Sequence, residues 1–211
     1  HILLKRVYVG KFYSNNINTK ELLTPTPFAK FLINENYIVK KNNLIELGCG
    51  NGRDAIFFAK QDVHVTAVDQ CENTTKYLKT VININSYHAD FTRLIEYKNN
   101  FDVVYSRFTL HSITDEDEQR TLGWIHNNLK KDGILCIEAR TLQDPIYGMG
   151  QDMGNNVWFY NEHHRRFIDA EEFVKKLKSF DFKIILSVEK NGFAKMGLDN
   201  DPVVLRVIAR K

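Results

Sequence analysis

The sequence predicts an α/β protein whose core is one doubly wound, seven-stranded mixed sheet, with helices on both faces and the last strand antiparallel. Between residues 44 and 139, five strand-like apolar segments alternate with helix-like segments, which is the pattern of parallel strands joined by helical crossovers. Near the C-terminus, two more strand-like segments follow one another with no long helix between them, which favours a closing hairpin. A length of 211 residues suits one such domain.

The individual elements follow from the local spacing of apolar residues. Parallel strands are expected at residues 44–47, 63–69, 84–90, 101–106 and 133–139. Helices are expected at residues 53–60, 73–82 and 115–129, with Lys130, Lys131 and Gly133 ending the last of them. The closing hairpin is expected at residues 182–189 and 202–209.

Two regions lie outside this alternation. In the first, Thr26 and Pro27 are typical of a helix start, and we expect residues 1–40 to form an N-terminal cap over the ligand site of the main domain, residues 41–211. In the second, residues 140–166 are polar, glycine-rich and without a clear period. A loop of that length in a compact domain is usually functional, so we expect it at the substrate site.

Composition and charge narrow the classes of partner. The net charge of +3 is too small to indicate nucleic acid or a membrane surface, which favour a clustered basic face. No apolar run approaches the roughly 18 residues that span a bilayer. Cys49, Cys71 and Cys136 are odd in number and far apart, which argues against disulfides and C-x-x-C metal pairs. We therefore expect a cytoplasmic protein with no nucleic-acid or membrane partner.

A glycine-rich turn, ELGCGNG, joins the first strand of the main domain to the helix that follows. Gly48, Gly50 and Gly52 allow a ligand to approach the backbone at a helix N-terminus. A P-loop would need a lysine after its last glycine, and none follows. A dinucleotide-binding turn would need its third glycine where Arg53 stands. The turn therefore indicates another kind of ligand.

Two acidic residues belong to the same region. Glu46 would repel a pyrophosphate but suits a ligand with a positively charged amino group. Asp69 ends the second strand, 69 − 52 = 17 residues after the last glycine, where a carboxylate can bind ribose hydroxyls. A ligand with a ribose, an ammonium group and no phosphate is S-adenosylmethionine. The simpler alternative is a structural glycine turn, with Asp69 capping the next helix.

The motifs ELGCGNG, VTAVDQ and HADF, in this order, resemble those of the class I S-adenosylmethionine-dependent methyltransferases, which have a Rossmann-like fold. The resemblance covers nearly the whole chain. It implies that Asp69, with Gln70 beside it, lies at the ribose, that Asp90 binds the adenine amino group, and that Phe91 packs on the adenine ring. It also implies that the methionine side is lined by Gly48, Gly50 and Gly52, with Glu46 near the amino group and Ser106 at the end of the fourth strand.

The acceptor is expected beyond the carboxyl ends of the strands. His111 follows the fourth strand, where members of this family often place catalytic groups, and its imidazole could take a proton from an acceptor hydroxyl. Arg107 leaves the same strand and would add positive potential. We therefore name His111 and Arg107 as candidate catalytic residues, the alternative for His111 being a hydrogen bond to a loop carbonyl.

A cluster of basic residues, EHHRRF, precedes the helix that begins near Asp169. Its histidines lack the spacing of metal ligands, so no metal is expected. Guanidinium groups suit phosphate and carboxylate, which favours a small anionic acceptor over a merely solvated charge cluster. The candidate substrate-binding residues are Tyr13, Arg140, His163, His164, Arg165 and Arg166.

Other functions of this fold have less support. Amino methyltransferases of nucleic acids carry Asn/Asp-Pro-Pro-Tyr after the fourth strand, where this chain has YSRF, and the acidic motif of polyamine synthases is not evident. RNA or protein methylation, and cofactor binding without turnover, stay open as alternatives. A narrower resemblance, carried by TPTPFAKFL, RFTLHSI, HHRRF and DPVVLRVIARK, is to bacterial small-molecule methyltransferases of capsule and surface-polysaccharide biosynthesis. It implies O- or N-methylation of a sugar-derived, phosphorylated or phosphoramidate acceptor.

Overall fold

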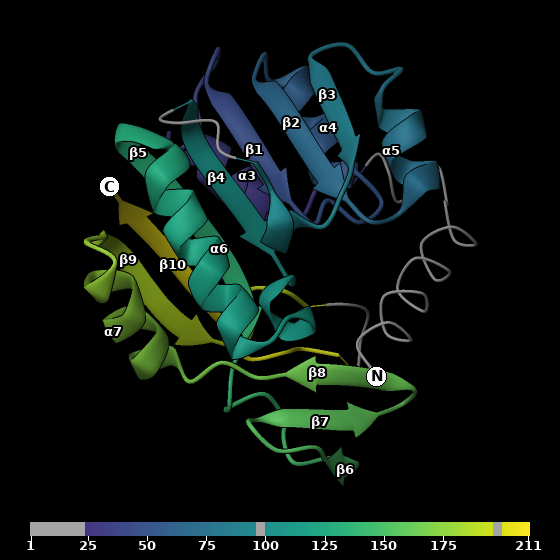
Figure 1. Ribbon diagram of the computed structural model, residues 1–211, viewed down its shortest axis with the longest axis vertical. Helices are drawn as coiled ribbons and strands as arrows, with labels where there is room; N and C mark the ends of the chain where they lie inside the picture. Colours follow the sequence, from purple (N-terminus) through teal and green to yellow (C-terminus); the bar gives the residue numbers. More distant parts are fainter. Residues whose placement is uncertain (1–23, 96–99, 196–199) are drawn as a thin grey trace.

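One mixed sheet forms the centre of the molecule (Figure 1). The computed structural model describes residues 24–95, 100–195 and 200–211. The seven strands lie in the order β3-β2-β1-β4-β5-β10-β9. Their bounds are β1 Asn43–Leu47, β2 His64–Asp69, β3 Ile84–His88, β4 Phe101–Arg107, β5 Leu129–Arg140, β9 Lys183–Lys190 and β10 Val204–Arg210. Strands β1 to β5 run parallel and β10 is antiparallel to both neighbours, which confirms the predicted fold class.

Helices cover both faces of this sheet, as predicted. On one face, a single apolar cluster includes side chains of α3 (Pro27–Asn34), α4 (Arg53–Lys60) and α5 (Glu72–Leu78). On the other face, a second cluster includes side chains of α6 (Asp115–Asn128) and α7 (Ala170–Ser179). Because successive strand residues point to opposite faces, Tyr105 belongs to the first cluster and Val104 to the second. Within the described ranges, no helix is both long and apolar enough to cross a bilayer.

Helix α3 begins as predicted. The Thr26 hydroxyl accepts a hydrogen bond from the backbone N–H of Ala29, 3.2 Å away, and so caps the helix. Pro27 stands in the first turn, where its missing N–H leaves no intrahelical bond unmade. Phe28 and Leu32 are fully buried and fix α3 on the same face as α4.

The predicted boundary between helix α6 and strand β5 is wrong. Helix α6 ends at Asn128, whose side-chain amide donates to the Trp124 carbonyl at 2.7 Å, and β5 begins at Leu129. Lys130 and Lys131 therefore lie in the strand rather than at a helix end. Asp132 has a positive φ of 65°, and the pairing of β5 with β4 shifts register in this stretch. Lys130, Lys131 and Gly133, which predicted a helix stop, instead form the irregular start of β5.

Residues 140–166 were expected to be an irregular loop, and this prediction is also wrong. They include a three-stranded antiparallel sheet of β6 (Gln151–Asp152), β7 (Val157–Tyr160) and β8 (His163–Arg166), which we call the meander. Asn161 and Glu162 form the two-residue turn between β7 and β8, and both have positive φ, as this class of hairpin requires. The meander projects from one end of the molecule, away from β1, β2 and β3 (Figure 1).

Candidate active site

The glycine-rich turn lies where β1 meets α4, at the carboxyl edge of the sheet. Gly48 and Gly52 have φ values of 74° and 81°, which side chains rarely tolerate. A Cβ atom on Gly48 would lie 2.5 Å from the methyl carbon of Thr109, and one on Gly52 would lie 2.7 Å from Leu78. Glycine is therefore required here by backbone conformation and by space. The backbone N–H of Gly48 donates to the Val68 carbonyl at 2.8 Å, which fixes the turn against β2.

Asp69 holds this turn from the end of β2. One oxygen of its carboxylate accepts the N–H of Gly50 and the other accepts the N–H of Cys71, each at 2.8 Å. Burial raises the pKa of Asp69, and these backbone bonds oppose the shift. Asp69 thus orders the glycine turn and the start of α5 together. Each carboxylate oxygen keeps a second lone pair that can accept a hydrogen bond from a ligand hydroxyl, which is compatible with ribose binding. The ribose assignment itself stays a prediction.

Glu46 lies beside the turn, in β1, and is almost completely buried. Its Oε2 atom has no hydrogen-bond partner among the described residues. Burial, followed by the negative charges of Asp54 and Asp69, raises the pKa of Glu46 well above its ordinary value. An unpartnered buried carboxylate is costly, so this arrangement suits a cationic ligand group.

The remaining residues predicted for the cofactor surround the same edge. Asp90 caps the short helix η1 (Phe91–Arg93) by accepting the N–H and the hydroxyl of Thr92, at 3.0 and 2.7 Å. Phe91 is buried, and its ring edge lies close to Gly48. The Ser106 hydroxyl bonds to that of Thr109. Gln70 follows Asp69, and its carbonyl lies 3.1 Å from a ring nitrogen of His88.

Sequence reasoning missed a buried cluster that ties α3 to this edge. Asp54 follows the glycine turn, and its carboxylate accepts the backbone N–H and the hydroxyl of Thr26, both at 2.8 Å, and the hydroxyl of Tyr105 at 2.7 Å. The three residues come from separate parts of the chain, so no local pattern could indicate the contact. The Thr26–Asp54–Tyr105 cluster fixes the start of α3 beside the first turn of α4.

A row of charged residues crosses the sheet next to this cluster. Arg107 of β4, Glu138 of β5 and Arg206 of β10 stand in register. Arg107 Nε donates to one oxygen of Glu138 at 2.8 Å, and Arg206 Nε donates to the other at 2.6 Å. All three side chains are largely buried. Two guanidinium groups therefore share one carboxylate, which leaves one positive charge in excess.

The row continues towards the meander. The guanidinium carbons of Arg107 and Arg140 lie 4.1 and 5.5 Å from the ring centre of Phe108. Arg140 pairs with Asp144 at 2.7 Å, and Arg165 donates to the Tyr160 carbonyl at 3.0 Å. Burial, followed by the positive charge of Arg140, lowers the pKa of Arg165. We call Arg107, Arg140, Arg165 and Arg206 the arginine cluster.

The arginine cluster carries more positive charge than its partners neutralise. Four guanidinium groups are balanced by the two carboxylates of Glu138 and Asp144, so the excess is 4 − 2 = +2. The sequence indicated Arg107, Arg140 and Arg165 separately, but not Arg206 or Glu138, which lie inside apolar strands.

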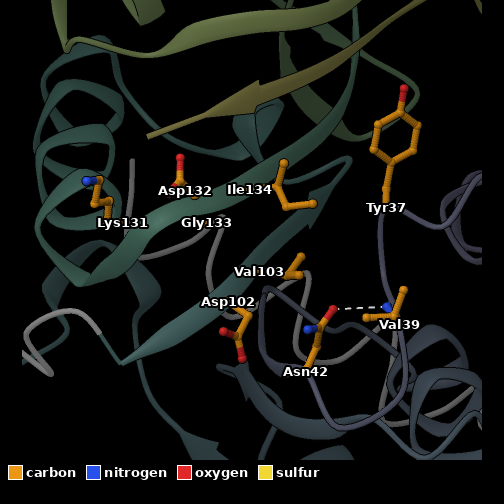
Figure 2. Close-up of a pocket in the computed structure, with 9 residues that line it drawn as sticks. All are labelled: Tyr37, Val39, Asn42, Asp102, Val103, Lys131, Asp132, Gly133 and Ile134. Atoms are coloured by element: carbon orange, nitrogen blue, oxygen red, sulfur yellow. Dashed lines mark hydrogen bonds between the residues drawn. The ribbon is translucent and has the colours of Figure 1, made fainter.

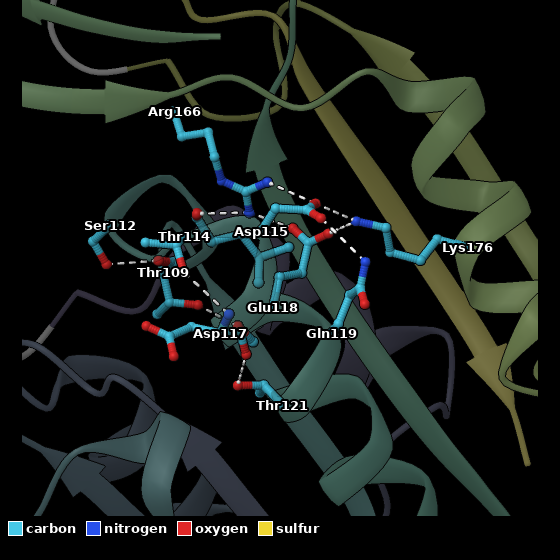
Figure 3. A network of polar contacts seen from close by, with 12 residues as sticks. Thr109, Ser112, Thr114, Asp115, Asp117, Glu118, Gln119, Thr121, Arg166 and Lys176 are labelled. Carbon is cyan, nitrogen blue, oxygen red and sulfur yellow. Dashed lines mark hydrogen bonds and ion pairs between the residues drawn. The ribbon is translucent and has the colours of Figure 1, made fainter. Parts of the chain in front are cut away.

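Arg166 belongs to a separate network with acidic residues of α6 (Figure 3). Its guanidinium is buried, forms an ion pair with Glu118 of α6 and donates to the Leu110 carbonyl at 3.2 Å. Lys176 of α7 completes the network, with 2.6 Å bonds to Glu118 and to Asp115. The charge of Arg166 is balanced in this network, and we interpret it as a link between β8, α6 and the short helix η2 (Leu110–Ser112). Its Nε has no hydrogen-bond partner among the described residues, and its assignment as an acceptor ligand stays a prediction.

The predicted histidines occupy different positions. His111 lies in η2, and its ring meets that of Phe108 edge-on, with 6.3 Å between the ring centres. His163 and His164 lie in β8, where the His164 ring is tilted against that of Phe159, with 4.6 Å between the ring centres. Tyr13 and most of the predicted N-terminal cap lie outside the described residues. Within those residues, no three His, Cys, Asp or Glu side chains are grouped to hold a metal ion.

Comparison with known proteins decides the family. The sequence model of a family described as "Methyltransferase domain" matches residues 25–187. The chain belongs to this methyltransferase family. An uncharacterized methyltransferase from Schizosaccharomyces pombe is 30% identical over 102 residues, which cover 46% of this chain and 70% of that protein.

Two further similarities bear on this methyltransferase domain. A Geobacillus sp. (strain WCH70) protein named as a methyltransferase is 26% identical over 128 residues, 54% of this chain; the chain spans about half (52%) of that relative. The structure of the Burkholderia thailandensis 1,6-didemethyltoxoflavin-N1-methyltransferase, with 1,6-didemethyltoxoflavin and S-adenosylhomocysteine bound, shares the fold with a TM-score of 0.67. It is 19% identical and covers 88% of this chain and 76% of its own.

S-adenosylmethionine is the cofactor of this methyltransferase, and the residues present fit it. The glycine turn leaves room for a ligand against the backbone, and Glu46 offers an unpartnered buried oxygen to an ammonium group. Carboxylates also stand at the ends of β2 and β3, where Asp69 and Asp90 are predicted to bind the ribose and the adenine.

A hollow of about 230 Å³ lies elsewhere in this methyltransferase (Figure 2). It opens near the amino ends of β1 and β4, so it faces the edge of the sheet opposite the glycine turn. Its walls include Tyr37, Asn42, Asp102 and Lys131. None of the predicted site residues lines it, and it takes no part in the assignments made for the cofactor and the acceptor.

Proposed function

We propose that the protein transfers a methyl group from S-adenosylmethionine to a small anionic acceptor bound at the arginine cluster. The observation that carries this proposal is the excess of two positive charges at the carboxyl edge of the sheet, close to the cofactor residues. Buried guanidinium groups need compensating negative charge, and residues 24–95, 100–195 and 200–211 supply only part of it. An anionic acceptor would supply the rest.

The cofactor brings a methyl group already activated by the sulfonium, so the protein has to align the acceptor and exclude water. Glu46, Asp69 and Asp90 would hold the two ends of the cofactor. Gly48, Gly50 and Gly52 would bring its methionine part close to the backbone. Ser106 and Phe91 would close the adjacent walls.

Arg107 is the best placed acceptor ligand. Glu138 holds its Nε, while its two Nη groups have no hydrogen-bond partner among the described residues. A planar guanidinium fixed in this way can bind phosphate or carboxylate with two parallel hydrogen bonds. Arg140 and Arg165 would bind further oxygens of the acceptor, with His163 and His164 nearby in β8 and Tyr13 contributed by the N-terminal segment.

His111 is the candidate general base. It stands on η2, beside Phe108 and next to the carbonyl that Arg166 holds. A base is needed if the methylated atom is a hydroxyl oxygen, and its role would then be to take that proton. From the narrower resemblance, we further propose that the acceptor is phosphorylated, a phosphoramidate or sugar-derived. We also propose that it belongs to capsule or surface-polysaccharide synthesis. A cytoplasmic location is likewise an expectation.

Methyl transfer from tritiated S-adenosylmethionine into a fractionated extract of the source cells tests the proposal. We expect label in a small-molecule fraction that an anion-exchange column retains. An Arg210→Gln variant, the matched control for substitutions in the arginine cluster, should label the same fraction as the unaltered protein, because this exposed arginine lies at the far end of β10. Label that enters RNA or protein instead would contradict a small acceptor, and no transfer to any fraction would contradict enzymatic methyl transfer.

A further inference from the structure

One buried oxygen at the cofactor side has no hydrogen-bond partner in the part of the chain that the structure describes. Glu46 is only 4% exposed, and its Oε2 accepts no hydrogen bond from residues 24–95, 100–195 or 200–211. Its strand position is fixed on both sides, because Glu46 pairs with Ala67 of β2 and with Tyr105 of β4.

Ionisable groups face Glu46 from every element packed around it. They are Asp69 of β2, Tyr105 and Arg107 of β4, Cys49 of the glycine turn, and Arg53 and Asp54 of α4. The carboxylates of Asp54 and Asp69 oppose a negative charge on Glu46, whereas the two arginines favour it. Arg107 already pairs with Glu138. Burial is the largest influence, and it raises the pKa of Glu46.

Asp54 does not supply a hydrogen-bond partner for the carboxyl group of Glu46. Its two oxygens accept three hydrogen bonds from Thr26 and Tyr105, so these donors are already used. Asp54 lies in the first turn of α4, next to the helix N-terminus. Of the two carboxyl groups, Glu46 is the one with an oxygen that lacks a hydrogen-bond partner among the described residues.

We propose that Glu46 holds a proton in the free protein and releases it to solvent when the ammonium group of the cofactor binds. The inference rests on the proposed function, which places the methionine end of the cofactor at the glycine turn. A neutral buried carboxyl costs less than a lone carboxylate, and an arriving ammonium reverses that preference. The exchange is balanced, since one carboxyl proton leaves as one ion pair forms.

The sign of the pH dependence follows from linkage. Between the ordinary carboxyl pKa of about 4.3 and the raised value of Glu46, the free protein holds a proton that the complex lacks. Affinity for an ammonium-bearing ligand should therefore increase with pH in this window, by up to about tenfold per unit, and level off above it. The ligand's own α-amino group stays charged up to roughly pH 8.

Isothermal titration calorimetry with S-adenosylhomocysteine measures the released proton directly. Binding enthalpies recorded at a series of pH values above the ordinary carboxyl pKa, in buffers of different ionisation enthalpy, give the number of protons released at each pH. The matched ligand is the desamino analogue of S-adenosylhomocysteine, which keeps the adenosine and the carboxylate but lacks the amine. We expect S-adenosylhomocysteine to release a proton at the lower end of the series, with release falling as the pH passes the raised pKa of Glu46, and the analogue to release none at any pH. The Glu46→Gln variant should bind more weakly and release none.

The comparison of the two ligands on the unaltered protein needs no variant, so it stands even if Glu46→Gln fails to fold. Equal proton release with both ligands, or release that persists in Glu46→Gln, would assign the proton to another group such as Asp69 and overturn the inference. Binding of S-adenosylhomocysteine without proton release would overturn the inference but leave the proposed function intact. A protein that binds neither ligand would overturn both.

Discussion

Glu46 and Asp69 are carboxylates on neighbouring strands, yet their surroundings prepare them for different tasks. Asp69 accepts backbone N–H groups on both oxygens, so its charge is compensated and its position is fixed. Burial raises the pKa of both residues, but Glu46 has an oxygen without a hydrogen-bond partner among the described residues. The first suits a hydrogen-bond acceptor for neutral hydroxyls, and the second suits a site for a cation.

The Asp69→Ala substitution tests the ribose assignment at this scale. Hydrogen bonds to a charged group contribute about 1.5–3 kcal/mol each, so we expect S-adenosylhomocysteine to bind roughly 10- to 100-fold more weakly. Calorimetric titration gives the affinity. Asp62→Ala is the control, because Asp62 forms only an exposed ion pair with Lys41. Unchanged affinity in Asp69→Ala would remove Asp69 from the ribose site.

At the scale of elements, the buried network of Arg166, Glu118 and Lys176 connects four parts of the chain (Figure 3). The meander is joined to α6 through Glu118, to α7 through Lys176 and to η2 through the Leu110 carbonyl. His111 follows Leu110 directly in η2. The network therefore sets the position of the candidate base relative to the strand that carries Arg165.

Glu118→Gln tests how much this network stabilises the fold. The change removes the carboxylate of a buried ion pair and leaves Arg166 with Asp115 at 3.8 Å. Removing one partner of a buried pair typically costs about 3–5 kcal/mol, and we expect the free energy of unfolding in urea to fall by about 3 kcal/mol. Glu116→Gln, two residues away on the exposed side of α6, is the control and should change little. Equal free energies of unfolding for the two variants would show that the network does not stabilise the fold.

At the scale of the whole molecule, the sequence predicted the seven strands along the chain, the antiparallel closing strand and helices on both faces, because these depend on local apolar periodicity and turn residues. The meander was missed because Val157–Tyr160 and His163–Arg166 are short and only partly buried, so their alternation is weak. The Asn161–Glu162 turn was the one available signal. Pairings between distant residues, such as Asp54 with Thr26 or Glu138 with Arg206, have no local signature.

The separation of charge is also a property of the whole molecule. Carboxylates with raised pKa gather at β1 and β2, whereas excess guanidinium groups gather across β4, β5 and β10. A cationic cofactor and an anionic acceptor would each meet the opposite charge, and their reacting atoms would meet between the two regions. Electrostatic complementarity of this kind favours correct orientation as well as affinity.

The assignment of the acceptor site to the arginine cluster is tested most directly by the rate of label transfer into the anion-exchange-retained fraction. This rate is measured for Arg107→Gln and Arg140→Gln, beside the Arg210→Gln control. Each substitution removes a charged hydrogen-bond donor, so we expect the acceptor KM to rise roughly 10- to 100-fold, while affinity for S-adenosylhomocysteine stays within about twofold. Arg210→Gln should match the unaltered protein. If the acceptor KM were unchanged in both Arg107→Gln and Arg140→Gln, the arginine cluster would not be the acceptor site, and the proposed anionic acceptor would lose its structural basis.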